Sequence, residues 1–425
     1  MKTLDAVAAS LQGYDPQALR ADTALQFLRT LVTPLVQTET VPLKAALGRV
    51  LAADLVSPID VPAHDNSAMD GYAFRGELLQ AGCALSLEVA GTAFAGKAWT
   101  GQIGAAQCLK IMTGAVMPAG LDTVVPQELV QREGPRITIP AGALQRGDNR
   151  RFKGEDLSLG QAALLAGTTI GPAALGLLAS LNIAQVGVRR QLRVAFFSTG
   201  DEILSLGESA REGAVYDSNR YTLFGLLTRM GVQVLDMGVV RDDPIALEAA
   251  FQQAAEQADA IITSGGVSVG EADHTKAVMQ KMAGGPSGVA FWKIAMRPGR
   301  PMAVGRIGSA MLFGLPGNPV AVMVTFLAFV RPALLQMMGC ASKELPLLKA
   351  HSLESIRKKP GRTEYQRAIV QTHANGSLQV RTTGQQGSGV LSSMAVANGL
   401  LVLHHEQGNV AVGEEVDVLM FDGVI

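Results

Sequence analysis

The residues whose types and spacing could support catalysis begin in the segment Asp259–Lys276, which has the sequence DAIITSGGVSVGEADHTK. Its first residues form a short apolar run with two adjacent isoleucines, which is typical of a buried strand. Two glycines, Gly265 and Gly266, follow this run, and an amphipathic helix is predicted to begin near Asp273. A glycine-rich connection between a strand and a helix can present backbone N–H groups to an anion. Because Glu271 and Asp273 add two carboxylates, the segment predicts a site for a phosphate-bearing ligand together with Mg²⁺.

Two further acidic residues, Glu202 and Asp242, each follow another predicted strand. Ligands of open parallel sheets bind beyond the carboxyl ends of the strands, so Glu202, Asp242 and Asp273 are expected at one edge of the sheet. Carboxylates about 5 Å apart repel each other by about 3 kcal/mol at an effective dielectric near 20. Such a cluster therefore needs a cation, a shifted protonation state or basic partners. Mg²⁺ bound by these acids and by substrate oxygens would supply the cation.

Basic partners are expected in residues 292–301, which have the sequence WKIAMRPGRP. The prolines and the glycine restrict the backbone between Lys293, Arg297 and Arg300, and cations held in fixed directions suit an oxyanion. Simpler interpretations exist for each part, because a glycine pair is most often a tight turn and two arginines are often a solvated loop. Three acids after three successive strands favour a catalytic or metal-binding role.

The elements that must position these residues alternate from Leu192 onward. Strands are predicted at 192–197, 232–237 and 259–263, with helices at 220–230 and 244–257 between them. Gly231 is suited to end the first helix, and Asp243 is expected to cap the second. Further apolar runs lead to a long helix that ends near Met338. This alternation predicts an α/β domain with an open parallel sheet covered on both faces.

The remaining segments predict additional domains. Residues 22–56 and 157–188 have helical patterns, whereas the glycine-rich stretch between them has short alternating runs that indicate a β-rich insertion. The two helical segments are therefore expected to pack together. Residues 345–425 return to β structure, with a hairpin at Asn375-Gly376. The predicted domains are a discontinuous helical linker domain at 1–58 and 151–190, an inserted β-rich domain at 59–150, an α/β domain at 191–342 and a C-terminal β domain at 343–425.

The composition argues against several other classes of protein. With 48% hydrophobic and 17% charged residues the chain is typical of globular proteins, and 36 basic against 37 acidic residues give no general field for nucleic acid. The three cysteines form no close pair and the six histidines no i, i+4 pair, which makes a disulfide framework or a zinc site unlikely. The most apolar run, 320–330, is too short to span a bilayer before Arg331-Pro332. We expect a cytoplasmic protein without membrane or nucleic-acid partners.

A series of motifs spans nearly the whole chain: DNSAMDGYA at 65–73, MTGA at 112–115, FSTGDE at 197–202, YDSNR at 216–220, RDDP at 241–244, SGGVSVGEAD at 264–273 and GLPGNP at 314–319. In this order they resemble the MoeA family of molybdopterin molybdenumtransferases, which includes the E domain of gephyrin. The resemblance implies a MogA-like α/β domain and the last step of molybdenum cofactor synthesis. In that step adenylylated molybdopterin is cleaved with Mg²⁺, AMP is released, and molybdate is transferred to the dithiolene sulfurs.

The resemblance also implies roles by position. Four acids would be catalytic and the last three of them would bind the metal: Asp70, Glu202, Asp242 and Asp273. The pterin or its phosphate would contact Thr113, Ser264, Gly265, Gly266, Ser268, Lys293 and Asn318. Molybdate would contact Arg297, Arg300, Pro301, Arg362, Arg367 and Ser388. A homodimer is implied whose site lies between the α/β domain of one subunit and the β-rich domain of the other, with other cofactor-synthesis proteins as further partners.

Two alternative functions stay open. Small adenylyltransferases of the MogA type share the glycine loop and the sheet, but they do not have the additional β domains of this chain. A non-catalytic pterin-binding scaffold is the other alternative, since gephyrin shows that the fold can serve as one. The presence of all four acids favours catalysis.

Overall fold

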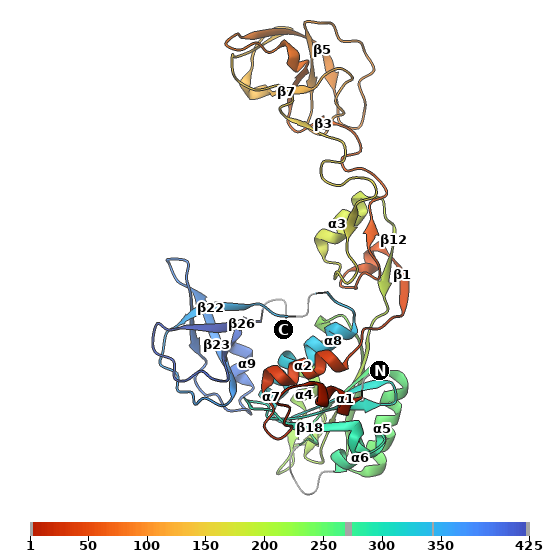
Figure 1. The fold of residues 1–425 in the computed structure, drawn as a ribbon, viewed down its shortest axis with the longest axis vertical. Helices are drawn as coiled ribbons and strands as arrows, with labels where there is room; N and C mark the ends of the chain where they lie inside the picture. The colour runs from red at the N-terminus through yellow and green to blue at the C-terminus, as the bar shows by residue number, and fades with distance from the viewer. Residues whose placement is uncertain (1–2, 268–273, 342–343, 422–425) are drawn as a thin grey trace. The chain divides into compact units, whose positions relative to one another are not determined.

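The computed structural model describes residues 3–267, 274–341 and 344–421. Asp273 and Ser268, two of the predicted site residues, lie outside the described residues, and so does Glu271. The chain forms two compact units, one made of residues 1–52, 167–171 and 186–425 and the other of residues 53–166 and 172–185 (Figure 1). The second unit is thus an insertion in the sequence of the first.

A six-stranded sheet forms the centre of the first unit. Its strand order is β16 (Gln233–Val240), β13 (Arg193–Thr199), β17 (Ala260–Ser264), β21 (Ala310–Leu315), β20 (Pro301–Ile307) and β18 (Val289–Lys293). The first four strands are parallel, which confirms the predicted parallel sheet, whereas β20 and β18 extend it in antiparallel pairing. Only Gly308 and Ser309 join β20 to β21, and two residues can make a hairpin but no crossover to a parallel strand.

Helices cover both faces of this sheet, as the sequence predicts. Consecutive residues of a strand point to opposite faces, so Phe196 joins the core beneath α4 (Ser218–Arg229) while Phe197 joins the core beneath α5 (Pro244–Gln257) and α6 (His274–Met282). Helix α5 begins as expected, because the Asp243 carboxylate accepts a hydrogen bond from the Ala246 N–H at 2.8 Å. Gly231 follows α4 with φ of 72°, the conformation that the sequence suggests for it.

The apolar run after Asn318 continues further than the sequence suggests. Helix α7 (Pro319–Thr325) passes through a π-helical turn at Phe326–Val330 into α8 (Arg331–Met337), so the helix is not interrupted at Arg331-Pro332. A wider turn before the proline accommodates its ring and its missing N–H. The resulting 19-residue helix is long and apolar enough to cross a membrane, but 72% of its apolar window is buried inside the protein. It is a core helix, packed with α2 (Ala21–Leu31) and α4.

The prediction that residues 22–56 and 157–188 are helical is only partly correct. Helix α2 and, in the second unit, α3 (Pro172–Ser180) are present, but β1 (Thr38–Pro42) pairs with β12 (Gln185–Arg189), and β2 (Leu55–Val56) pairs with β11 (Ala162–Leu164). The two segments therefore lie together as expected, although strand pairing joins them. Leucine and alanine spacing suggested helices, and long-range pairing overrode it.

The second unit is β-rich, as predicted, with a six-stranded sheet in the order β7-β4-β6-β5-β9-β8. These strands are β7 (Thr123–Pro126), β4 (Gly71–Phe74), β6 (Gln107–Ile111), β5 (Leu85–Ala93), β9 (Arg136–Ile139) and β8 (Gln131–Glu133). Side chains alternate between two cores, so that Tyr72 and Ala73 face opposite ways. The exact boundaries of the four domains stay a prediction.

The C-terminal strands close into a barrel. Strand β23 (Thr363–Thr372) pairs with β24 (Leu378–Thr382) and also with β25 (Gly399–Leu403), and β22 (Leu347–Ser352) and β26 (Glu415–Met420) complete the ring. The hairpin predicted at Asn375-Gly376 joins β23 to β24. A short sixth strand, β19 (Met296–Arg297), adds to β23 from outside, with Arg297 opposite Glu364. This pairing attaches residues 296–301, which carry the predicted anion-binding arginines, to the barrel.

The start of the central strand β17 is held by Asp259, which lies between two arginines. Its carboxylate accepts hydrogen bonds from Arg190 Nη2 at 2.9 Å and from the Arg193 N–H at 2.8 Å. Burial alone would raise the pKa of Asp259, but the hydrogen bonds of Arg190 and Arg193 outweigh it and hold the pKa below the ordinary value of 3.8. A lowered pKa in the folded state means that the stabilisation is complete above the ordinary pKa and is lost as the pH falls through the folded value.

We therefore expect Asp259→Asn to lower the free energy of unfolding by about 2 kcal/mol at pH 7, since hydrogen bonds to charged groups contribute this much. The difference between the two proteins should shrink as the pH falls below the ordinary pKa of 3.8 and through the lowered pKa of the folded state, where the wild-type carboxylate also becomes neutral. Urea unfolding of both proteins at several pH values measures it. A difference that does not change with pH would contradict this role of the charge.

Candidate active site

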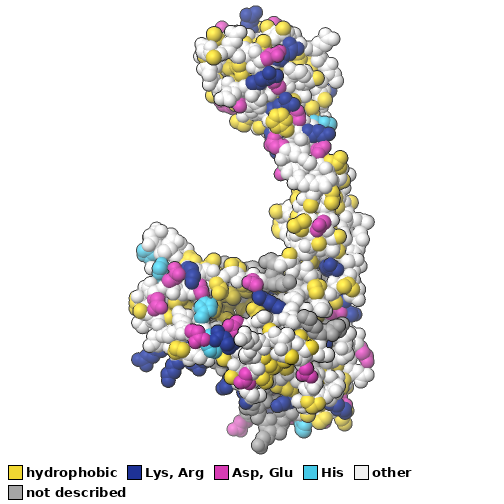
Figure 2. Space-filling model, in the orientation of Figure 1, with side chains coloured by type: hydrophobic (Ala, Val, Ile, Leu, Met, Phe, Trp, Pro, Cys, Tyr) yellow, Lys and Arg dark blue, Asp and Glu magenta, His cyan; other side chains and the backbone are white. Residues whose placement is uncertain are grey.

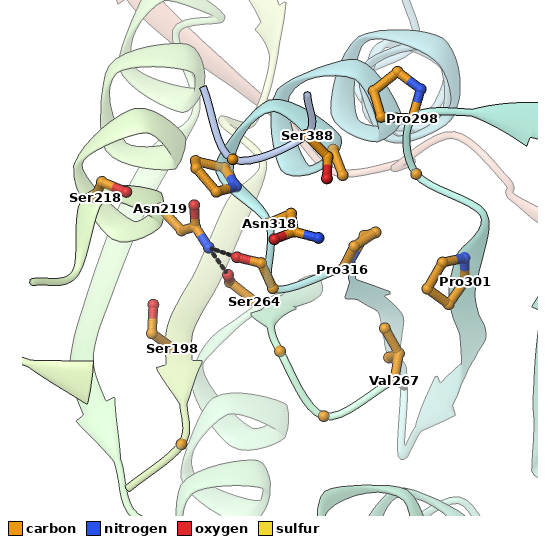
Figure 3. Close-up of a pocket in the computed structure, with 18 of the residues that line it drawn as sticks. Ser198, Ser218, Asn219, Ser264, Val267, Pro298, Pro301, Pro316, Asn318 and Ser388 are labelled. Carbon is orange, nitrogen blue, oxygen red and sulfur yellow. Dashed lines mark hydrogen bonds between the residues drawn. The ribbon is translucent and has the colours of Figure 1, made fainter. Parts of the chain in front are cut away.

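A cavity of about 1170 Å³ lies beyond the carboxyl ends of the parallel strands in the first unit (Figure 3). Residues that follow β13, β16 and β17 line it, together with the start of α4, the turn before α7, residues 296–301 and residues 386–389. The cavity thus lies where the sequence predicts the site. Its volume is sufficient for a ligand of the size of a pterin joined to a nucleotide.

Two of the predicted acids, Glu202 and Asp242, line this cavity. The Glu202 carboxylate folds back over Gly200, where a Cβ would lie 2.4 Å from Glu202 Oε2 and where a φ of 140° disfavours any residue with a side chain. Asp242 Oδ1 accepts a hydrogen bond from Thr275 Oγ1 at 3.3 Å. The sequence prediction that strand ends bring these acids to one edge is correct for both residues.

The glycine pair after β17 makes the turn that its sequence suggests. Gly265 and Gly266 have φ of 95° and 69°, a region in which residues with a side chain are strained. A Cβ on Gly265 would lie 2.8 Å from the backbone oxygen of Thr199, and one on Gly266 would lie 2.4 Å from Thr275 Cβ. The turn is therefore pressed between β13 and α6, and its backbone borders the cavity.

A hydrogen-bonded group at the start of α4 was not predicted as part of the site. Asp217 caps the helix by accepting from the Arg220 N–H at 3.1 Å, and it also accepts from Ser198 Oγ at 2.9 Å. Asn219 donates from Nδ2 to Ser264 Oγ at 2.7 Å and to the Gly317 carbonyl at 2.7 Å. An aspartate just before a predicted helix is a capping signal that could have indicated this group. The partners of Asn219 come from distant parts of the chain, which local patterns do not reveal.

Arg297 and Arg300 border the same cavity, whereas Arg367 is not among the residues that line it. Arg297 and Arg300 are exposed, and neither makes an ion pair among the residues that the structure describes. Arg367 is completely buried, and it donates to Ser393 Oγ at 2.9 Å and to the Gly387 carbonyl at 2.8 Å. Burial lowers the pKa of the Arg367 guanidinium, and the nearby charge of Arg297 lowers it further. An anion bound between two neighbouring guanidinium groups would relieve their mutual repulsion.

The other predicted anion-binding residues differ in position. Pro301 and Ser388 line the large cavity, and so does Asn318. Arg362 instead donates to Glu364 Oε1 at 2.8 Å, and Lys293 lies in the edge strand β18, so that neither is among the residues lining the cavity. A second cavity of about 60 Å³ lies beside the first and is bordered by Arg297, Arg357 and Arg367. Lys and Arg side chains also gather on the lower edge of the barrel domain (Figure 2).

Asp70 and Thr113, the two predicted site residues of the β-rich unit, contact each other. Asp70 Oδ1 accepts from Thr113 Oγ1 at 2.6 Å and from the Thr113 N–H at 2.7 Å. These two bonds hold the pKa of Asp70 below its ordinary value of 3.8, and the bond from the Thr113 hydroxyl has the larger effect. The Asp70 side chain is thus an exposed, oriented carboxylate at neutral pH.

Comparisons with known proteins find similarity to one family along nearly the whole chain. Three protein-family descriptions match it in order: the MoeA N-terminal region (domain I and II) at residues 19–182, a probable molybdopterin binding domain at 195–336, and the MoeA C-terminal region (domain IV) at 349–421. A molybdopterin molybdenumtransferase of Haemophilus influenzae is 42% identical over 92% of this chain and 95% of its own length. A molybdopterin molybdenumtransferase of Nostoc is 36% identical over 96% of this chain and 95% of its own length.

A crystal structure of a molybdopterin biosynthesis moeA protein from Pyrococcus horikoshii superposes with a TM-score of 0.80 at 28% identity. The superposition covers 95% of this chain and 100% of the Pyrococcus horikoshii chain. These similarities confirm the predicted fold class and the prediction of a transferase in molybdenum cofactor biosynthesis. The chain therefore belongs to the MoeA family of molybdopterin molybdenumtransferases.

Proposed function

We propose that the protein cleaves adenylylated molybdopterin in a Mg²⁺-dependent reaction, releases AMP, and transfers molybdate to the dithiolene sulfurs of the pterin. One observation carries the proposal: carboxylates that suit a cation and arginines that suit an oxyanion line the same cavity, namely Glu202, Asp242, Arg297 and Arg300. In this reaction water breaks the phosphoanhydride, so the nucleotide leaves as AMP and the pterin keeps its own phosphate.

The donors around Glu202 and Asp242 fit Mg²⁺. No group of three or more histidine, cysteine, aspartate or glutamate side chains that could hold a metal occurs within residues 3–267, 274–341 and 344–421. Mg²⁺ does not need one, since it usually keeps several waters and takes one or two carboxylates together with phosphate oxygens. Asp273 would be a further ligand. When bound, the ion would supply charge stabilisation at the phosphoanhydride.

Residues of the chain itself would orient the phosphate, position the Asp242 carboxylate and bind molybdate. The backbone around Gly265 and Gly266 would orient the phosphate, because a strained turn at the end of a strand presents N–H groups to an anion. Thr275 would hold the Asp242 carboxylate toward the cavity. The arginines would bind molybdate, and the buried Arg367 would hold residues 385–387 around it through their carbonyls.

We further propose that the enzyme acts as a homodimer in the cytoplasm, with Asp70 and Thr113 supplied to each site by the other subunit. Their mutual hydrogen bonds support a shared role, because they keep an ionised carboxylate oriented on an exposed surface. Other proteins of cofactor synthesis would deliver the pterin or receive the product.

The decisive experiment is incubation of the protein with adenylylated molybdopterin, Mg²⁺ and molybdate, followed by measurement of AMP and of molybdenum bound to the pterin. The proposal expects AMP and inserted molybdenum in equal amounts, and neither without Mg²⁺. Formation of the adenylate from ATP and molybdopterin would instead identify an adenylyltransferase. Tight binding without turnover would identify a scaffold.

A second test concerns Arg300. Arg300→Ala is expected to raise the molybdate concentration needed for half-maximal insertion about tenfold, since one charge-assisted hydrogen bond to an anion contributes that much. Affinity for molybdopterin should change less than about twofold, because the lost hydrogen bond is one to molybdate and not to the pterin. Titration of insertion with molybdate, beside pterin-binding measurements, gives both values. Arg229→Ala, which removes an exposed arginine at the end of α4, is the matched control.

A further inference from the structure

The loop that joins β24 to α9 (Ser392–Val396) supplies part of the cavity wall. Residues 386–389 line the large cavity, and Figure 3 shows Ser388 among the side chains around it. The sequence at 383–389 is TGQQGSG, and its three glycines give the backbone little conformational preference of its own. Contacts with other segments must therefore hold this part of the wall in place.

The side chain of Arg367, on β23, makes the first of these contacts. Its Nη2 donates to the carbonyls of Gln385 and Gly387 at 3.1 and 2.8 Å, and its Nε donates to Ser393 Oγ at 2.9 Å. All three acceptors are uncharged, although the guanidinium is completely buried and its nearest charged neighbour in the described part of the chain is another arginine, Arg297. A buried cation without a counter-charge is unfavourable, so an anion bound nearby would stabilise it.

Gln386 makes the reciprocal contact, from the loop to β23. Its Oε1 accepts from the Arg367 N–H at 2.9 Å, and its Nε2 donates to the Arg367 carbonyl at 3.1 Å and to Thr383 Oγ1 at 3.4 Å. On the other side, Val320 at the start of α7 donates its N–H to the Ser388 carbonyl at 3.1 Å. The loop is therefore fixed between the barrel and α7.

These bonds use the carbonyls of the loop and leave its N–H groups free. None of the N–H groups of residues 385–389 donates a hydrogen bond to any residue that the structure describes. The peptide bonds here are trans, so each N–H points opposite to the carbonyl before it. The N–H groups that follow the carbonyls of Gln385, Gly387 and Ser388 consequently point away from Arg367 and α7. A row of free N–H groups suits an anion.

We propose that Gln386 is a positioning residue, which fixes residues 385–389 so that their N–H groups and the Ser388 hydroxyl bind the oxyanion. The carboxamide of Gln386 would act without touching the oxyanion, because its oxygen and its nitrogen are both bonded to Arg367. Gln386 also borders the small cavity together with Arg297 and Arg367, which places the loop beside both positive charges. The inference deepens the proposed function and rests on molybdate occupying this site.

The role can be tested by equilibrium dialysis of the full-length protein against molybdate, with separate binding measurements for AMP and molybdopterin. Gln386→Met keeps the length of the side chain but loses its hydrogen bonds. Gln386→Glu keeps the shape and the acceptor for the Arg367 N–H, but it places a negative charge in the loop. Gln336→Met is the control, because the Gln336 carboxamide donates to the carbonyls of Arg29 and Val32 and Gln336 lines neither cavity.

Gln386→Met is expected to weaken molybdate binding about tenfold, the effect of losing one hydrogen bond to a charged group, and to change binding of AMP and molybdopterin less than about twofold. Gln386→Glu should bind molybdate about threefold more weakly still at low salt, because the new carboxylate repels the oxyanion. A residue that only stabilised the barrel would give the reverse order, since glutamate keeps one of the hydrogen bonds. Gln336→Met should lower the melting temperature as Gln386→Met does, yet bind molybdate normally.

The inference is overturned if Gln386→Met binds molybdate as tightly as the wild type does, or if all three ligands lose affinity equally. It is also overturned if Gln386→Glu binds molybdate no more weakly than Gln386→Met. Failure of the wild type to bind molybdate would overturn this inference together with the proposed use of molybdate. A wild type that binds molybdate but releases no AMP would count against the proposed reaction alone.

Discussion

Asp242→Asn is expected to lower the rate of Mg²⁺-dependent AMP release by about 100-fold or more, the usual effect of removing one group that stabilises charge in a reaction. The carboxylate lines the cavity and is oriented by Thr275 Oγ1. An amide in its place has nearly the same size but carries no charge to bind a cation. The fold should be unaffected, so the melting temperature should change little while turnover falls.

The neighbouring residue provides the control for this prediction. Asp243 does not line the cavity, and its carboxylate caps α5 by accepting from the Ala246 N–H. Asparagine caps helices about as well as aspartate, so Asp243→Asn should retain both activity and stability. The assay is AMP release over a range of Mg²⁺ concentrations for both variants. Equal activity of the two variants would remove Asp242 from the reaction.

Gly266→Ala should abolish most of the activity by a different route. The new Cβ would lie 2.4 Å from Thr275 Cβ, and the φ of 69° adds backbone strain of about 1–2 kcal/mol. Thr275 must then move, and its hydroxyl is the group that holds Asp242. Displacements of about 1 Å at reacting groups can cost about 100-fold in rate, and we expect a loss of that size here.

The control for this glycine is Gly308, in the two-residue turn between β20 and β21. Its φ is 58°, but a Cβ there would meet no atom within 4 Å. Gly308→Ala should therefore cost about 1–2 kcal/mol of stability from backbone strain and leave AMP release unchanged. Thermal unfolding and AMP release of both variants separate strain from steric displacement. If Gly266→Ala keeps full activity, the glycine turn does not position the phosphate.

Local signals predicted the elements that carry the acids. The cap at Asp243, the helix end at Gly231 and the glycine turn after β17 each depend on a few consecutive residues, and all are present. The placement of Glu202 and Asp242 followed from topology alone, since neighbouring parallel strands end at the same edge. These features needed no knowledge of contacts between distant segments.

Long-range pairing accounts for what the sequence did not predict. The strand pairs β1–β12 and β2–β11 lie within longer segments, residues 22–56 and 157–188, whose leucine and alanine residues suggest helices. The side chain of Asn219 meets residues 45 and 98 positions away, and no periodic pattern marks such contacts. Lys293 illustrates the opposite case, because a basic residue close to the arginines in sequence lies on an edge strand that does not line the cavity.

The pairing of β19 with β23 makes the cavity depend on the barrel as well as on the α/β sheet. A fragment that ends at residue 341 would keep the glycine turn and both acids, but it would leave Met296 and Arg297 without their strand partners Thr363 and Glu364. Under the proposed function, such a fragment would bind molybdate more weakly than the full chain does. A one-residue slip of β23 would likewise direct its side chains to the opposite face and misalign the arginine loop. Under the proposed function, substitutions within the barrel that shift β23 would change the oxyanion preference while leaving Glu202 and Asp242 in place.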